Sequence, residues 1–181
     1  MAAEPLSDVW TLAHLTVAPS SIAGSGLFAG DDITTGELVL RLGGRLVDTT
    51  ELDELIREAN EDGRYVDTIT VVEDTHLVLP EATIVHFANH RCDPNLWHDG
   101  AYDIRARHAI ARGEELTIDY GTNSGAPGFE MACACGAAKC RGVITSEDWR
   151  RPELQARYAG HWVPALAQRI ARNRDNTNSR Q

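Results

Sequence analysis

Asn-His-Arg-Cys-Asp-Pro-Asn, residues 89–95, is the stretch of sequence that decides how this chain folds. Two later segments are equally unusual: Glu-Leu-Thr-Ile-Asp-Tyr-Gly at 115–121 and Cys-Ala-Cys-Gly-Ala-Ala-Lys-Cys at 133–140. The last segment holds every cysteine of the chain except Cys92. Because cysteine is confined to two places in the sequence, we expect folding to bring those two places together.

The length and composition are those of a soluble protein with one domain. A chain of 181 residues buries a core without cross-links, and its hydrophobic and charged fractions of 43% and 24% are ordinary. The N-terminus lacks the layout of a signal peptide, and no apolar run is long enough to span a bilayer. We therefore expect a cytoplasmic protein without a membrane partner, with a nuclear or nucleoid-associated location as the other option. Cysteines in such compartments serve metals or catalysis more often than disulfides.

The charge balance is acidic, with a formal net charge of −10. Direct binding of nucleic acid depends on clustered Lys and Arg, so this balance argues against it. An acidic surface attracts cationic partners such as lysine-rich protein tails. Solubility alone is an equally good explanation, because net charge does not say where the charges gather.

The hydrophobic pattern predicts many short strands followed by helices. Strands are expected at 10–17, 38–42, 45–47, 65–72, 75–79, 84–87, 102–106 and 115–120, and Gly43-Gly44 has the form of a two-residue hairpin turn. Apolar residues repeat at helical spacing over 49–61, and Gly63 ends that helix. Further helices are expected at 146–158, interrupted at Pro152, and at 164–172, followed by a frayed tail.

The spacing of the cysteines indicates a metal site. Cys133 and Cys135 are separated by one residue, and Gly136 lets the backbone fold back to deliver Cys140. Three thiolates leave tetrahedral zinc one ligand short, and Cys92 completes the set of four that structural zinc sites use. Unliganded thiols or a redox pair are the alternatives, although redox motifs favour two residues between the cysteines.

Histidine is also a zinc ligand, and His90 and His98 lie close to Cys92 in the sequence. Either histidine could replace a cysteine, but four cysteines already complete the shell. Zinc is therefore the expected metal. The expected ligands are Cys92, Cys133, Cys135 and Cys140.

Taken together, the motifs resemble those of SET-domain protein lysine methyltransferases that carry a post-SET zinc motif. The matching segments are Gly-Ser-Gly-Leu-Phe-Ala at 24–29, Asn-His-x-Cys-x-Pro-Asn at 89–95, Gly-Glu-Glu-Leu-Thr-Ile-Asp-Tyr-Gly at 113–121 and Cys-x-Cys-Gly-x₃-Cys-Arg-Gly at 133–142. They occur in the family's order with compatible spacing, and the resemblance covers roughly residues 17–144. A single Gly-x-Gly would be weak evidence, whereas four ordered motifs are strong.

The resemblance implies a mainly β fold with some α-helix. Small antiparallel sheets would wrap into a pseudoknot in which the segment around Tyr120 passes beneath the loop that carries Asn89. The expected organisation is a SET domain at 1–121, a post-SET zinc-binding segment at 129–145 and a C-terminal helical extension at 146–181. The residues expected to form an apolar cover for the sheets are Trp149, Tyr158, Trp162 and Leu166.

The resemblance also implies S-adenosylmethionine as methyl donor. The residues implied to bind it are Gly24, Ser25, Gly26, Tyr65, Asn89 and His90. A glycine turn lets the backbone approach a ligand closely, so the turn at 24–26 would lie along the methionine part of the cofactor. The Asn-His pair would hold the methionine amine and the adenine, through a side-chain amide and backbone groups.

Tyr120 is the residue implied to carry the chemistry. Methyl transfer to lysine is an in-line displacement, so orientation supplies much of the acceleration, and a phenol near the sulfonium contributes polar positioning. The acceptor must be a neutral amine, although free lysine has a pKa of about 10.4. A dry channel beside the positive sulfonium lowers that pKa, and the sequence offers no His or Glu that stands out as a base. Asp119 either orients the turn at Tyr120 or is an exposed acid at a strand end.

Three departures from the family pattern concern specificity. Ile118 stands where many relatives carry Phe or Tyr, and the absence of a hydroxyl there weakly favours higher methylation states. Leu42 replaces a tyrosine that lines the lysine channel in many relatives. His86 occupies a position often held by Arg.

The expected function is therefore S-adenosylmethionine-dependent methylation of lysine in a protein substrate, a histone or another basic protein. One alternative is a catalytically weak SET-type zinc protein that binds a partner. Another is a zinc-stabilised module that binds nucleic acid, and the acidic charge counts against it. The presence of Tyr120 and of the Asn-His pair favours the enzyme.

Overall fold

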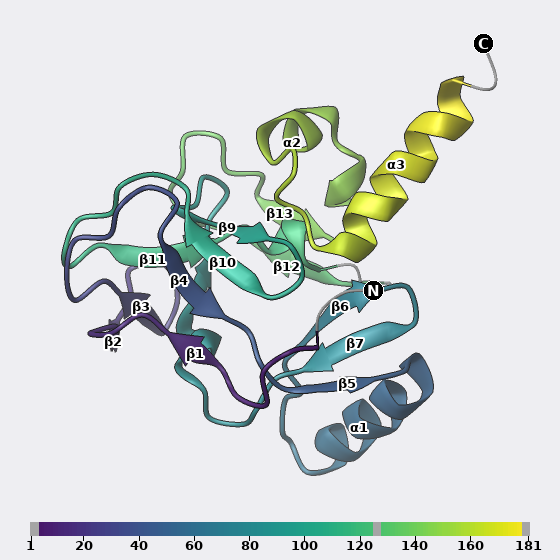
Figure 1. The fold of residues 1–181 in the computed structure, drawn as a ribbon, viewed down its shortest axis with the longest axis horizontal. Helices are drawn as coiled ribbons and strands as arrows, with labels where there is room; N and C mark the ends of the chain where they lie inside the picture. Colours follow the sequence, from purple (N-terminus) through teal and green to yellow (C-terminus); the bar gives the residue numbers. More distant parts are fainter. Residues whose placement is uncertain (1–3, 125–127, 179–181) are drawn as a thin grey trace.

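The computed structural model describes residues 4–124 and 128–178 (Figure 1). The strands are β1 (Trp10–Thr11), β2 (Thr16–Pro19), β3 (Ser25–Phe28), β4 (Leu38–Arg41), β5 (Arg45–Val47), β6 (Thr68–Val72), β7 (Thr75–Val78), β8 (Asn89–His90), β9 (Leu96–Asp99), β10 (Asp103–Ala106), β11 (Glu115–Ile118), β12 (Glu130–Ala132) and β13 (Val143–Thr145). The α-helices are α1 (Thr49–Glu61), α2 (Pro152–Arg157) and α3 (Pro164–Asn178). Single 3₁₀ turns are η1 (Ile84–Phe87), η2 (Tyr120–Thr122) and η3 (Asp148–Arg150).

These strands form small sheets, which confirms the expected fold class of mainly β structure with some α-helix. The sheet orders are β1-β4-β10-β9, β2-β3-β11-β8, β5-β7-β6 and β12-β13. In Figure 1, α1 lies beside the β5-β7-β6 sheet, and α3 begins near β6 on the side of that sheet away from α1, with α2 next to α3. No helix in the described part of the chain is long and apolar enough to cross a membrane.

One strand pair departs from the expected antiparallel pattern. β8 and β11 pair in parallel, with Thr117 opposite Asn89 and Ile118 opposite His90. The main-chain N–H of Arg91 then donates to the carbonyl of Ile118. This pairing brings the Asn-His motif beside the segment that leads to Tyr120, which is the proximity that the resemblance implies.

The main hydrophobic core joins these sheets to the C-terminal helices. Residues from the first sheets, such as Leu27, Leu40 and Leu116, are fully buried in the same cluster as the C-terminal residues Trp149, Tyr158, Trp162 and Leu166. The prediction of an apolar C-terminal cover is therefore confirmed. Pro152 is the first residue of α2, so the predicted interruption is a helix start, where the missing N–H of proline costs nothing.

The predicted hairpin at Gly43-Gly44 is wrong. β4 and β5 belong to different sheets, and the two glycines are the point where the chain passes from one sheet to the other. A Cβ on Gly43 would lie 2.0 Å from the carbonyl oxygen of Asp8, and one on Gly44 would lie 2.1 Å from that of Val78. The glycines therefore serve close backbone contacts with distant segments, which local turn rules do not detect.

Four other local predictions also need correction. The strand expected at 10–17 is divided into β1 and β2 by a turn at His14, which has a φ of 64°. Residues 84–87 form a 3₁₀ turn, and Tyr120 begins another instead of ending a strand. The tail expected to fray after Arg172 continues as helix to Asn178. The helix over 49–61 is confirmed, with Asp48 capping its first turn.

Asn95 binds the loop at 89–95 to the central strand β11. Its side-chain amide donates to the carbonyl of Glu115 at 2.8 Å, and its carbonyl oxygen accepts the N–H of Thr117 at 2.8 Å. Asn95 is buried, so water cannot replace these bonds if they are lost. β8 has only two residues, and this amide supplies further contacts to the strand that β8 pairs with.

We expect Asn95→Ala to destabilise the protein by roughly 2–4 kcal/mol, because two buried main-chain groups of β11 lose their partner. Chemical denaturation measures this change. The matched control is Asn60→Ala on the exposed face of α1, which should stay close to the wild-type stability. Equal effects of the two substitutions would show that Asn95 does not hold the loop.

Candidate functional site

Tyr120 lies directly after β11 and is held at both ends. Its phenol donates a hydrogen bond to the carbonyl oxygen of Ala88 at 3.0 Å, and its main-chain N–H donates to Nδ1 of His90 at 3.1 Å. Burial, and secondarily the charge of Asp67, raises the pKa of Tyr120 to about 12. The phenol therefore stays protonated at neutral pH and acts as a hydrogen-bonding group, not as a base.

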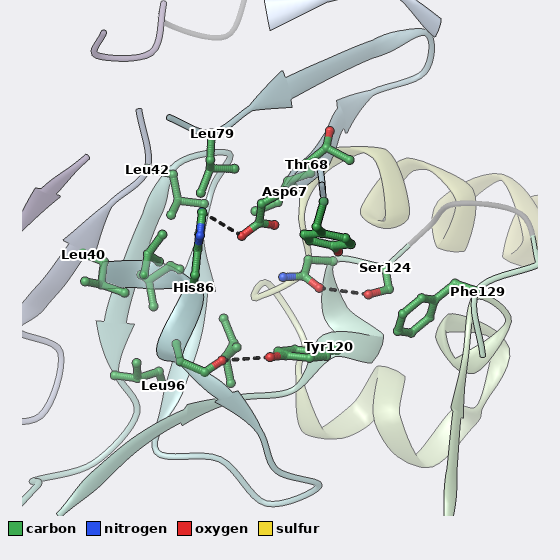
Figure 2. A pocket seen from close by; sticks show the side chains of 17 residues that line it. Leu40, Leu42, Asp67, Thr68, Leu79, His86, Leu96, Tyr120, Ser124 and Phe129 are labelled. Carbon is green, nitrogen blue, oxygen red and sulfur yellow. Dashed lines mark hydrogen bonds and ion pairs between the residues drawn. The ribbon is translucent and has the colours of Figure 1, made fainter. Parts of the chain in front are cut away.

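A cavity of about 260 Å³, which we call the Tyr120 pocket, opens beside this phenol (Figure 2). Its lining residues are Leu40, Leu42, Tyr65, Asp67, Thr68, Ile69, Leu79, Val85, His86, Ala88, Leu96, Ile104, Ile118, Tyr120, Asn123, Ser124 and Phe129. Most of these side chains are aliphatic or aromatic, and the polar ones gather around Tyr120 and Asp67. Such a pocket suits a long apolar stem that ends in a polar group.

Two of the departures noted in the sequence line this pocket. Leu42 is fully buried and Ile118 nearly so, and both present aliphatic groups to the cavity. The third departure, His86, is also in the lining and lies 3.3 Å from a carboxylate oxygen of Asp67. Leu42 and Ile118 thus add no hydroxyl to the pocket, which also holds an acid and an imidazole.

Tyr65 lies at the same pocket as Tyr120. It is 85% exposed, so it stands at the rim and is free to contact a bound molecule. The residue is not part of a strand, because β6 begins only at Thr68.

The glycine turn at 24–26 meets Asn89 at a separate place, outside the lining of the Tyr120 pocket. The side-chain amide of Asn89 donates to the carbonyl oxygens of Ala23 and Ser25 and to the carboxylate of Glu115. The same carboxylate oxygen of Glu115 accepts the hydroxyl of Ser20 at 2.7 Å. Asn89 therefore fixes the shape of the turn and joins it to β11.

Both glycines of this turn have a structural reason. Gly24 has a φ of 47°, a left-handed conformation that glycine adopts most easily, and open space surrounds the position of its missing Cβ. A Cβ on Gly26 would lie 2.3 Å from the carboxylate oxygen of Glu115 that Asn89 holds. Gly26 is thus needed for packing against Glu115, whereas Gly24 exposes its backbone without a covering side chain.

The cysteines meet in space as expected. The sulfurs of Cys92 and Cys133 are 3.9 Å apart, and those of Cys133 and Cys140 are 3.7 Å apart. Tetrahedral zinc with Zn–S bonds of about 2.3 Å requires sulfurs about 3.8 Å apart. One ligand atom from each of His90, Cys92, Cys133 and Cys135 lies within 4.8 Å of the others, so this group could hold zinc.

His90 also reaches this cluster, because its Nε2 is 3.4 Å from the sulfur of Cys92. Its Nδ1 accepts the N–H of Tyr120, and burial lowers the pKa of the imidazole to about 4. The ring is therefore neutral, and its single proton sits on Nε2 and faces the sulfur. A nitrogen that carries a proton does not bind a metal, so in this tautomer His90 connects Tyr120 to the cluster as a hydrogen-bonding group.

The thiols differ in their readiness to ionise. Burial raises the pKa of Cys133 to about 11 and also raises that of Cys92. Burial acts on Cys135 in the same sense, but hydrogen bonds, including those from the main-chain N–H groups of Cys92 and Ala137, outweigh it and lower the pKa to about 7. A cation among these sulfurs would stabilise the thiolate form of all of them.

Asp119 has a role that the sequence left open. It is buried, and its carboxylate accepts two bonds of 2.6 Å from the guanidinium of Arg141, one from the hydroxyl of Tyr158 and one from the N–H of Gly121. Arg141 also pairs with Asp148 at 3.0 Å. The prediction of an exposed acid at a strand end is therefore excluded, and Asp119 orients the turn at Tyr120.

Sequence reasoning missed Arg141, Asp148 and Tyr158 as contributors to the site. Arg141 directly follows Cys140, so its place in the motif was the one available signal. The other two come from the C-terminal segment, and no local pattern relates them to Asp119. Asp67 was missed for the same reason, because nothing near it in the sequence points to Tyr120.

The predicted site residues thus form three groups that one short segment joins. Ala88 lines the Tyr120 pocket, Asn89 holds the glycine turn, and His90 reaches the cysteine cluster. These three residues are consecutive, so one short segment contacts the pocket, the turn and the cluster.

Comparison with known proteins places this arrangement in a family. The family model of the SET domain matches residues 24–121, which is more than half of the chain. The histone-lysine N-methyltransferase trithorax of Drosophila virilis is 32% identical in an alignment 142 residues long, which covers 71% of this chain and 4% of that protein. The probable histone-lysine N-methyltransferase set-23 of Caenorhabditis elegans is 33% identical in an alignment 137 residues long, which covers 65% of this chain and 54% of that protein. This chain therefore spans only part of the relatives it matches.

A solved structure agrees with the observed fold. The methyltransferase domain of the human histone-lysine N-methyltransferase SETMAR superposes with a TM-score of 0.59 at 24% sequence identity, over 75% of this chain and 59% of that one. At that identity the likeness concerns the fold alone. The match to the family model covers the glycine turn, the Asn-His motif and Tyr120. This chain belongs to the SET-domain family.

Proposed function

We propose that this protein is an S-adenosylmethionine-dependent protein-lysine N-methyltransferase. The observation that carries the proposal is the arrangement around Tyr120, whose phenol lies between a pocket lined mostly by aliphatic and aromatic residues and the Ala88-Asn89 segment. The pocket suits a lysine side chain, which has an apolar stem and a polar end. Relatives named as histone-lysine methyltransferases support the same reading.

The cofactor would bind where the glycine turn meets Asn89. The open backbone at Gly24 and Ser25 leaves room for the methionine part. Among the described residues, no hydrogen bond is recorded to the side-chain oxygen of Asn89, so this oxygen is available to accept the methionine ammonium. Gly26, the main chain of His90 and the rim residue Tyr65 complete the proposed cofactor site.

In this reaction the main contribution of the protein would be to orient the reacting groups. Bound S-adenosylmethionine would supply an electrophilic methyl group on a positive sulfonium. The lone pair of the lysine nitrogen forms the new C–N bond while the electrons of the C–S bond return to sulfur. Tyr120 holds its phenol oxygen beside this line of attack and, with the carbonyl of Ala88, orients the reacting groups through weak polar contacts.

We propose that zinc is bound by Cys92, Cys133, Cys135 and Cys140. The sulfur distances fit a tetrahedral ion, and the protonation of His90 favours Cys140 as the fourth ligand. Zinc would be structural, because a full thiolate shell leaves no position for water or substrate. It would hold residues 129–145 as a post-SET segment against the cofactor site.

The substrate would be a lysine in a basic protein, such as a histone or a histone-like protein. The net charge of −10 attracts a cationic chain, and the relatives are named for histone lysine. We propose the boundaries 1–121, 129–145 and 146–181 for the catalytic, zinc-binding and C-terminal segments. Because Leu42 and Ile118 bring no hydroxyl into the pocket, we propose that higher methylation states are accessible.

Substitution of the phenol tests the enzyme directly. We expect Tyr120→Phe to keep the fold and to lower methyl transfer by roughly 100-fold, because the reacting groups lose their polar support. The measurement is transfer of labelled methyl from S-adenosylmethionine to core histones and to a cell lysate. The matched control is Tyr102→Phe, which removes a hydroxyl outside the Tyr120 pocket. Turnover in Tyr120→Phe at the wild-type rate would remove Tyr120 from the mechanism.

Removal of zinc tests the coupling between the cysteine cluster and the cofactor site. We expect one zinc per chain, and we expect chelation to raise hydrogen exchange across residues 130–142. The affinity for S-adenosylmethionine should fall by about tenfold or more, which corresponds to about 1.4 kcal/mol. Calorimetry of the intact and chelated protein measures this difference. If the metal-free protein binds the cofactor at full strength, the cluster does not support that site.

A further inference from the structure

The Tyr120 pocket contains a carboxylate that the proposed chemistry does not use. Asp67 lies just before β6 and shares the pocket with Tyr120. Its Oδ2 is 3.3 Å from Nε2 of His86, which comes from the 3₁₀ turn η1. Figure 2 shows Asp67 and His86 pointing toward each other, with Tyr120 across the same cavity.

The charge balance of the pocket favours a cation. Among its described lining residues, Asp67 is the single carboxylate, and neither Lys nor Arg is present. The remaining titratable groups that face Asp67 are the phenols of Tyr65 and Tyr120 and the imidazole of His86. A positive group that enters the pocket therefore meets the carboxylate of Asp67, which no Lys or Arg of the lining neutralises. The imidazole of His86 lies next to this carboxylate.

A lysine substrate brings a proton that has to leave before the methyl group is transferred. Free lysine has a pKa of about 10.4, so nearly all of it carries an ammonium group at neutral pH. The ammonium has no lone pair and cannot attack a methyl group. The phenol of Tyr120 does not accept this proton, because it is itself protonated and donates to Ala88.

We propose that Asp67 receives the substrate ammonium in the Tyr120 pocket and, together with His86, conducts its proton to solvent. This inference rests on the proposed methyltransferase function. It assigns a substrate-binding and proton-accepting role to two residues that the family motifs do not contain.

The step balances as follows. The N–H bond of the ammonium breaks, its electron pair stays on the nitrogen as the lone pair for attack, and the proton goes to the carboxylate of Asp67. After methyl transfer, the proton passes to Nε2 of His86, which restores the carboxylate for the next substrate. About 31% of the His86 side chain is exposed, so its proton can be released to water.

The surroundings of Asp67 make this transfer less unfavourable than it would be in water. Burial raises the pKa of Asp67 above its ordinary value, which narrows the gap to the amine. In a partly dry cavity, a neutral acid beside a neutral amine costs less than the separated charges would. In this proposal, Asp67 thus attracts the substrate ammonium and then takes its proton, so that the amine becomes neutral.

The test is the pH dependence of kcat/KM for methyl transfer to core histones between pH 7 and 9.5. If Asp67 accepts the proton, the wild-type kcat/KM should change little with pH in this range. The proton that the ammonium brings stays on Asp67 during methyl transfer, so the reactive complex has lost no net proton. We expect kcat/KM of the Asp67→Asn variant to be at least tenfold below the wild-type value at pH 7. It should then rise about tenfold per pH unit toward the amine's pKa of about 10.4. The phenol of Tyr120, with a pKa of about 12, does not titrate in this range.

A second readout does not depend on turnover. The probes are n-butylamine, which is a cation at neutral pH, and the neutral 1-butanol, and NMR titration measures the affinity for each. The wild-type chain should bind the cation at least tenfold more tightly than 1-butanol, and Asp67→Asn should lose this preference. The matched control is Glu81→Gln, which removes an exposed charge outside the pocket lining and should keep both the preference and the wild-type pH profile. His86→Gln should lower the rate at pH 7 but keep the preference.

The outcomes are distinguishable. Absence of transfer by the wild-type chain at every pH overturns the proposed function, and the amine titration then decides alone whether Asp67 binds a cation. Transfer by the wild-type chain with an identical pH profile in Asp67→Asn overturns the inference and leaves the methyltransferase in place. A wild-type kcat/KM that itself rises tenfold per pH unit also overturns it, because the proton would then be lost to solvent before methyl transfer and not be held by Asp67.

Discussion

The structure depends on one buried ionic contact, between the carboxylate of Asp119 and the guanidinium of Arg141. Buried charges are tolerated only when they are paired and hydrogen-bonded, and here the hydroxyl of Tyr158 and the N–H of Gly121 complete the shell of Asp119. The partners come from the end of β11, from the segment after the last cysteine and from α2's C-terminal cap. Three parts of the chain that are far apart in sequence must therefore fold together, because each would otherwise leave a charge or polar group unsatisfied.

The consequence is that Tyr120 is held from several directions. Asp119 fixes the turn that follows β11, His90 accepts the main-chain N–H of Tyr120, and Ala88 accepts its phenol. A side chain held at both its backbone and its hydroxyl loses little freedom when a substrate binds. Methyl transfer requires alignment more than charge stabilisation, so rigid placement is the feature that such a site needs most.

The Tyr120 pocket combines two requirements that oppose each other. Aliphatic lining from residues such as Leu42 and Ile118 excludes water and favours a neutral amine, whereas the carboxylate of Asp67 attracts the charged form. Placing the acid beside the partly exposed His86 would let the pocket take up a cation and still deliver a neutral nucleophile. The cysteine cluster contributes indirectly, since His90 joins it to Tyr120.

The sequence by itself determined the family, the motif residues and the meeting of Cys92 with the C-terminal cysteines, because short motifs in a fixed order carry that information. It also determined the helix at 49–61, whose spacing and capping are local properties. Only the tertiary structure decided that β8 and β11 pair in parallel, that Gly43-Gly44 joins two sheets, and that Asp119 is buried against Arg141. These features arise from contacts between segments dozens of residues apart, and no local pattern encodes them. The same reason explains why Asp67 was missed, since its relation to Tyr120 exists only after β6 and β11 have been brought to the same cavity.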